Sequence, residues 1–175
     1  MFCAIIKANT AYEVIDMQQK RIAKYLKMIV LGVCCCAILG YAVVLPIYGQ
    51  DVASRYPEFS HAFWPWLIYL WVTALPVAWA LVLAWGMFDR IGKGGSFSHA
   101  NVKALHRIGM LALTDTAYFF LGQVVLLLCS MSHPGILLVS LLVVFVGLAA
   151  AAVCFALSAL TKSAVQLREE NELTI

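Results

Sequence analysis

The chain has 175 residues, of which 63% are hydrophobic and only 12% are charged, and its formal net charge is +3. A water-soluble domain normally has about 25% charged residues. The composition therefore excludes an ordinary soluble protein and indicates a polytopic membrane protein. The small positive charge lies in short segments between apolar runs, so it does not favour direct nucleic-acid binding.

Four apolar runs are long enough to cross a bilayer, which takes roughly 20 residues of helix. Asp, Glu, Lys and Arg are absent from 28–50, 59–88 and 116–161, and the sequence SMSHPG at 130–135 divides the last run with a turn. We predict spans at about 28–48, 65–88, 109–131 and 135–160. The predicted fold is all-α: one domain, residues 1–175, that forms a bundle of four transmembrane helices with cytoplasmic amphipathic helical segments.

The basic residues predict the orientation of these spans. Of the twelve Lys and Arg residues, only Arg55 falls in the first–second or third–fourth connector. The others lie before the first span, between the second and third, or after the fourth. The positive-inside rule places those three segments, and with them both termini, in the cytoplasm.

Residues 12–27 are expected to form a cytoplasmic amphipathic helix that runs into the first span. Apolar side chains recur there at helical spacing, and Lys20, Arg21, Lys24 and Lys27 occupy other positions. Basic side chains beside a bilayer attract anionic headgroups. Membrane lipids are therefore expected partners.

The connector at 89–108 contains the unusual sequence GKGGSFSHANVKALHRIG at 92–109. Its glycines free the backbone after the second span, and Ser98 is a predicted N-cap for a helix that continues into the third span. The phosphate-binding pattern G-x-x-x-x-G-K-[ST] is absent. His99 and His106 are separated by roughly 10.5 Å of helix, too far to chelate one metal ion.

The segment GGSFSHANVKALHRIG at 94–109, together with the chain end LREENELTI, resembles a bacterial family of small four-helix membrane proteins of unknown function. The family pattern is G-x-x-F-S-x-x-N-V-x-x-L-x-x-I-G with an acidic tail, and His106 departs from it, because a basic residue is more usual there. The resemblance implies the bacterial inner (cytoplasmic) membrane and a cytoplasmic helix-turn-helix regulator as partner. It implies no activity.

The two motifs define a candidate cytoplasmic interaction motif. Its members are Phe97, Ser98, Asn101, Val102, Lys103, Leu105, Glu170, Asn171, Leu173 and Ile175. We expect the tail, 161–175, to pack back on the helix at 98–108, with Leu173 and Ile175 covering apolar surface near Phe97 and Val102. The alternative is a solvated, frayed tail, since chain ends are commonly disordered.

Asp115 is the one acidic residue inside a predicted span, and it defines a candidate intramembrane polar site with Thr114, Thr116 and Gln123. A carboxyl group in a membrane is costly and normally faces other helices. It is either a proton, ion or substrate site, or a structural group that neighbouring hydroxyls or water satisfy.

The sequence contains no pattern for a catalytic, metal or cofactor site, so we expect no enzyme activity. The leading hypothesis is a regulatory or interaction protein that presents a cytoplasmic surface to a partner. The alternative is a small transporter or channel that uses Asp115. Small residues four apart in the fourth span, such as Gly147 and Ala151, favour close helix packing within the chain or, alternatively, a homo-oligomer.

Overall fold

The computed structural model describes the backbone of residues 2–95, 97–132 and 134–173. Side chains are described from residue 17 onward within these ranges, except at 59, 134, 172 and 173. The described chain is helical, and four of its helices are long and apolar enough to cross a membrane. The predicted all-α fold with four transmembrane helices is confirmed.

The first helical stretch is longer than the first predicted span. Helix α1, Phe2–Leu39, continues through the π-helical turn η1, Gly40–Val44, into α2, Leu45–Arg55. A 3₁₀ segment, η2 at Pro57–Ala62, then leads into α3, Phe63–Gly92. Residues 49–55 of the expected first connector are therefore helical, and Pro46 lies within the continuous helical stretch without ending it.

The second half of the chain is a hairpin of two long helices. Helix α4 covers His99–Leu128 and α5 covers Pro134–Leu173. The turns before and after α4 share one geometry, in which a left-handed residue allows two hydrogen bonds back to the last helical turn. Gly94 takes this position after α3 with a φ of 84°, and Ser130 takes it after α4 with a φ of 58°.

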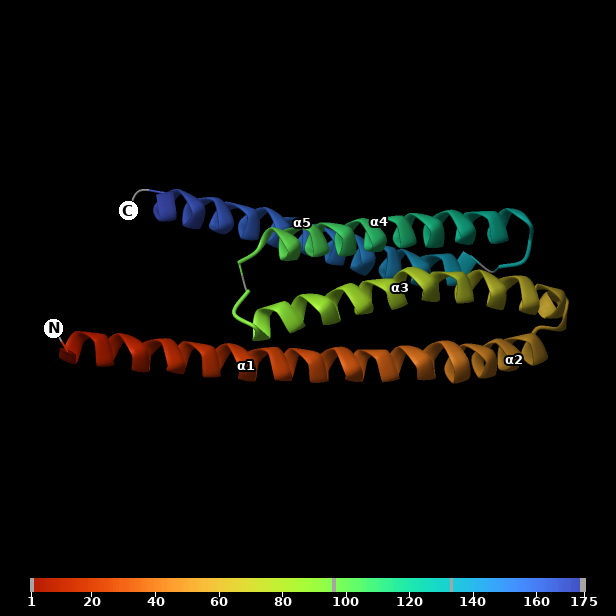
Figure 1. The fold of residues 1–175 in the computed structure, drawn as a ribbon. Coiled ribbons are helices and arrows are strands. Elements are labelled where there is room, and N and C mark those ends of the chain that lie inside the picture. Colours follow the sequence, from red (N-terminus) through yellow and green to blue (C-terminus); the bar gives the residue numbers. More distant parts are fainter. Residues whose placement is uncertain (1, 96, 133, 174–175) are drawn as a thin grey trace.

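The helices pack in chain order: α1 against α3, α3 against α4, and α4 against α5. Among the described residues, α1 and α5 do not pack on each other, so the bundle is open between them. Figure 1 shows the start of α1 and the end of α5 at the same end of the molecule, beyond the turn that joins α3 to α4. An even number of spans requires this arrangement.

The contact between α4 and α5 depends on small residues. A Cβ atom on Gly147 would lie 2.2 Å from Oγ1 of Thr116, so only glycine permits this approach. Further along α5, Ala151 is buried and the buried Ser158 hydroxyl donates to the Val102 carbonyl at 3.0 Å. Gly147, Ala151 and Ser158 thus pack within the chain.

The tail does not fold back as expected. Residues 161–173 continue α5 instead of leaving it, because sequence rich in Glu, Gln, Leu and Arg favours helix. Ser158 lies beside Val102, and Leu173 is roughly 22 Å further along α5 at 1.5 Å per residue. The predicted contact between Leu173 and Val102 is therefore wrong. Ile175 and the side chain of Leu173 lie outside the described residues.

Candidate functional site

Asn101, in the first turn of α4, joins the end of α3 to the start of α4. Only 2% of its surface is exposed. Its side-chain oxygen accepts a hydrogen bond from Nε of Arg90 at 2.8 Å, and its side-chain nitrogen donates to the Gly95 carbonyl at 2.9 Å. One buried amide therefore satisfies both a guanidinium and a loop carbonyl, which holds the turn in one conformation.

Other residues of the 94–109 motif also build this turn. Ser98 is the N-cap of α4, since its hydroxyl accepts from the Asn101 backbone N–H at 3.4 Å; the predicted cap is observed. Gly94 supplies the left-handed conformation. A Cβ on Gly109 would lie 2.9 Å from the Phe155 ring, so this glycine allows α4 and α5 to meet closely.

The remaining members of the candidate interaction motif are more accessible. Phe97 and Lys103 are exposed, and Val102 and Leu105 are half-buried. On α5, Glu170 and Asn171 are exposed, and the neighbouring Glu169 contacts Nε2 of His99 at 2.9 Å. The structure thus brings the two sequence motifs to the same end of the molecule, and it joins them through Glu169, a residue of the acidic tail that is not among the ten members of the candidate motif.

The candidate intramembrane site opens into a groove of about 470 Å³ that all four long helices line. Buried residues of α3 and α4, including Leu70, Thr73 and Thr116, form its base, and more exposed residues of α1 and α5 form its walls. The groove follows from the packing order, because α1 and α5 do not meet. Its lining residues all lie within the four candidate spans.

Asp115 lines this groove. Its Oδ1 atom is buried and has no hydrogen-bond partner among the described residues. The hydroxyl of the adjacent Thr116 donates instead to the Ala112 carbonyl of its own helix, at 2.7 Å. The nearby hydroxyl that sequence analysis offered as a partner is therefore already used.

The other two members of the predicted site do not line the groove. Thr114 is exposed on another face of α4, and Gln123 is buried two turns beyond Asp115. Oε1 of Gln123 also has no hydrogen-bond partner within the described part of the chain. The structure therefore brings Thr116, and not Thr114 or Gln123, to the groove with Asp115.

Sequence analysis missed the polar groups that the first half of the chain contributes to this groove. The Tyr41 hydroxyl lies 2.8 Å from Oγ1 of Thr73, and both residues line the groove. Nε1 of Trp71 donates to the Tyr41 carbonyl at 3.0 Å. Tyr41 lies within η1, and a π-helical turn inside a long helix is often found at functional sites. Pro46 follows this turn by two residues, and a proline inside a helix disturbs the hydrogen bonds of the preceding turn.

Comparisons with known proteins agree with this architecture. A family described as "Protein of unknown function (DUF2975)" matches residues 47–175. An uncharacterized membrane protein of Bacillus subtilis (strain 168), YoaS, is 29% identical over 150 residues, which cover 85% of this chain and 92% of that protein. No solved structure matches the chain.

Proposed function

This chain belongs to the DUF2975 family, and from that premise we propose that it is an inner-membrane interaction protein whose basic end and termini face the cytoplasm. Its partner binds there, at two helical arms that extend beyond the turn between α3 and α4. The arms are residues 2–18 of α1 and 166–173 of α5. They are the observation that supports this function best.

The arm of α1 extends beyond the end of α3. A Cβ on Gly92, the last residue of α3, would lie 3.0 Å from the Cβ of Ala23, so α3 ends level with Ala23 of α1. Figure 1 shows α1 extending past the end of α3, and residues 2–18 correspond to roughly 25 Å of helix at 1.5 Å per residue. This arm contains Phe2, Ile5 and Ile6, and a short helix with apolar side chains is marginal in water without a packing partner.

The charge of the arms favours a basic protein as partner. The arm of α5 contains Arg168 and three glutamates, a net charge of −2, and residues 166–171 are exposed. The arm of α1 contains Lys7, Glu13 and Asp16, a net charge of −1. Acidic arms are repelled by an anionic membrane surface. They attract a basic surface such as that of the helix-turn-helix regulator that the sequence resemblance implies.

Charge reversal at the arm of α5 tests this proposal. The variant is Glu169→Lys with Glu170→Lys, and the matched control is Asp51→Lys with Glu58→Lys at the opposite end of the molecule. Each protein is cross-linked in native membranes, purified, and its bound regulator quantified by mass spectrometry. We expect recovery of the regulator to fall at least tenfold in the first variant only. No regulator bound to the unaltered protein, or equal recovery from both variants, contradicts the proposal.

A second candidate function is uptake or export of a lipophilic cation, because Asp115 places an unpaired carboxylate oxygen at a groove between lipid-facing helices. A buried carboxylate is costly unless it meets a positive charge or a proton. The groove walls include Val143 and Val146 of α5, which suit an apolar substituent. The ligand class that fits is an amine with a hydrophobic body.

Flux through proteoliposomes distinguishes this second candidate. Uptake of a fluorescent lipophilic cation is compared for the unaltered protein, Asp115→Asn, and the control Asp51→Asn, which removes an exposed carboxylate outside the groove. Transport requires flux that Asp115→Asn abolishes and Asp51→Asn leaves unchanged. Equal flux in all three preparations, or none above protein-free liposomes, would exclude this function.

A further inference from the structure

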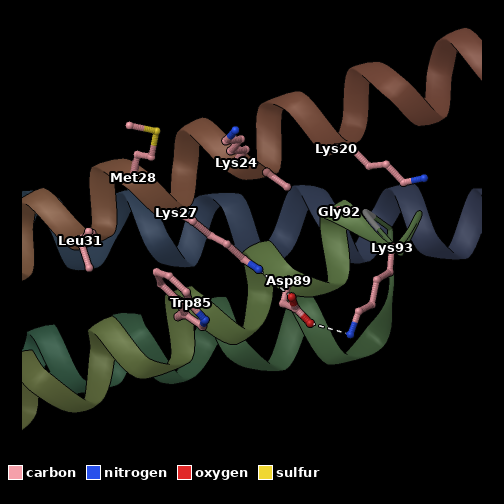
Figure 2. Close-up of a pocket in the computed structure, with 10 residues that line it drawn as sticks. Lys20, Lys24, Lys27, Met28, Leu31, Trp85, Asp89, Gly92 and Lys93 are labelled. Carbon is pink, nitrogen blue, oxygen red and sulfur yellow. Dashed lines mark hydrogen bonds and ion pairs between the residues drawn. The ribbon is translucent and has the colours of Figure 1, made fainter.

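A second groove, separate from the one at Asp115, lies between α1 and the end of α3. Its volume is about 390 Å³, and Figure 2 shows the side chains that line it. Its lining is graded along both helices. On α1, Lys20, Lys24 and Lys27 precede Met28 and Leu31. On the antiparallel α3, Trp85 precedes Asp89 and Gly92, and Lys93 follows the end of the helix. One end of the groove is therefore charged and the other is apolar.

The change from charged to apolar coincides with the predicted edge of the bilayer. The first span is predicted to begin at residue 28 and the second to end at residue 88. Met28, Leu31 and Trp85 thus lie just inside the membrane, and all four lysines lie just outside it. A groove with this position meets the headgroup region at one end and acyl chains at the other.

Asp89 holds two of the lysines in place. Its Oδ1 atom lies 2.6 Å from Nζ of Lys27, and its Oδ2 atom lies 2.7 Å from Nζ of Lys93. Nζ of Lys27 also lies 5.3 Å from the centre of the Trp85 ring, a cation–π distance. An ammonium group has three donors, so each lysine keeps donors for a second anion after it binds Asp89.

Close packing forms the base of the groove. Ala23 is 4% exposed, and a Cβ on Gly92 would lie 3.0 Å from the Ala23 Cβ. Two small residues therefore let the helix backbones approach, and longer side chains stand on either side. Lys27 and Asp89 lie above this base, and the more exposed Lys20, Lys24 and Lys93 stand at the rim of the groove.

From this geometry we propose that the groove binds an anionic phospholipid, with the headgroup phosphate at the lysines and an acyl chain along Met28, Leu31 and Trp85. Four lysines and one aspartate give the lining a net charge of +3, which a phosphate diester complements. The apolar end distinguishes a lipid from free phosphate, because phosphate alone would leave that end unused. This site is independent of the proposed cytoplasmic partner.

Native mass spectrometry of the detergent-purified protein measures the bound lipid directly. Phosphatidylglycerol and phosphatidylcholine are titrated against the unaltered chain and a groove variant with Lys20→Gln, Lys24→Gln and Lys93→Gln. The matched control removes three charges outside the groove, with Lys103→Gln, Arg107→Gln and Lys162→Gln. Each lysine near an anionic lipid contributes on the order of fivefold in affinity. We expect the groove variant to bind phosphatidylglycerol roughly 10-fold to 100-fold more weakly and the control to bind it normally.

Two further measurements test the proposal. Lys24→Gln alone leaves the Lys27–Asp89–Lys93 contacts intact, so it reports lipid affinity even if the triple variant does not fold; we expect a severalfold loss. Inorganic phosphate at millimolar concentration is added as competitor, and bound phosphatidylglycerol should remain. Equal loss in groove and control variants, equal affinity for phosphatidylcholine, or displacement by phosphate would each overturn the assignment.

Discussion

Replacing Asn101 by alanine should destabilise the protein more than any surface asparagine can. The change removes the hydrogen bonds to the Arg90 guanidinium at 2.8 Å and to the Gly95 carbonyl at 2.9 Å. A neutral bond contributes about 1 kcal/mol and a bond to a charged group about 1.5–3 kcal/mol. Because Arg90 is half-buried, water can hydrogen-bond to its guanidinium after the change and recovers part of the lost stability. The expected loss in the free energy of unfolding is therefore roughly 2–4 kcal/mol.

Thermal unfolding in detergent micelles, followed by circular dichroism, measures this loss. For a chain of this length a change of 3 kcal/mol corresponds to a decrease of roughly 6–12 °C in Tm. The matched control is Asn171→Ala, which truncates an exposed asparagine on α5 and should change stability by less than about 0.5 kcal/mol. If Asn101→Ala and Asn171→Ala have the same Tm, the buried amide does not hold the α3–α4 turn and the reasoning fails.

Three further changes follow from contacts elsewhere. Gly122→Ala should lower the free energy of unfolding by about 1–3 kcal/mol, because the new Cβ would lie 2.0 Å from the Tyr69 ring. The control Gly32→Ala, with no atom within 4 Å of its Cβ, should not destabilise the protein; comparable Tm values for the two variants would contradict this. Ser130→Gly should raise stability by about 1 kcal/mol, since its φ of 58° strains any residue with a Cβ, and an unchanged Tm would argue against that strain. Asp115→Asn should leave the unfolding free energy equal or higher, because the amide is neutral; a marked loss of stability would indicate a partner for the carboxylate.

The parts of the fold that the sequence predicted are those that local composition determines. Uninterrupted apolar runs located the four transmembrane helices, and Pro134 with Gly135 located the turn between α4 and α5. Ser98 was recognisable as a cap because Ser is favoured at that position. Where each helix ends was harder to predict. A charged segment after a span, such as 161–173, is typical of a tail, yet its residue types also favour helix.

The site depended on contacts that no local pattern contains. Helices that are apolar on all sides give no signal for which face packs inward, so the pairing of Tyr41 with Thr73, 32 residues apart, was not predictable. Asn101 illustrates a second difficulty. A polar residue in a recognisable motif can serve a partner or the fold, and only its burial and its bonds to Arg90 and Gly95 show that it builds the turn.

The orientation of the basic end is the claim on which the proposed cytoplasmic partner depends, and reporter fusions test it most directly. Two reporters are fused after Gln50, Gly94 and Ser132. Alkaline phosphatase is active only outside the cytoplasm. Green fluorescent protein is fluorescent in the cytoplasm but not after export through the general secretory route. We predict phosphatase activity after Gln50 and Ser132 and fluorescence after Gly94. Fluorescence after Gln50 or Ser132, or phosphatase activity after Gly94, would contradict the account.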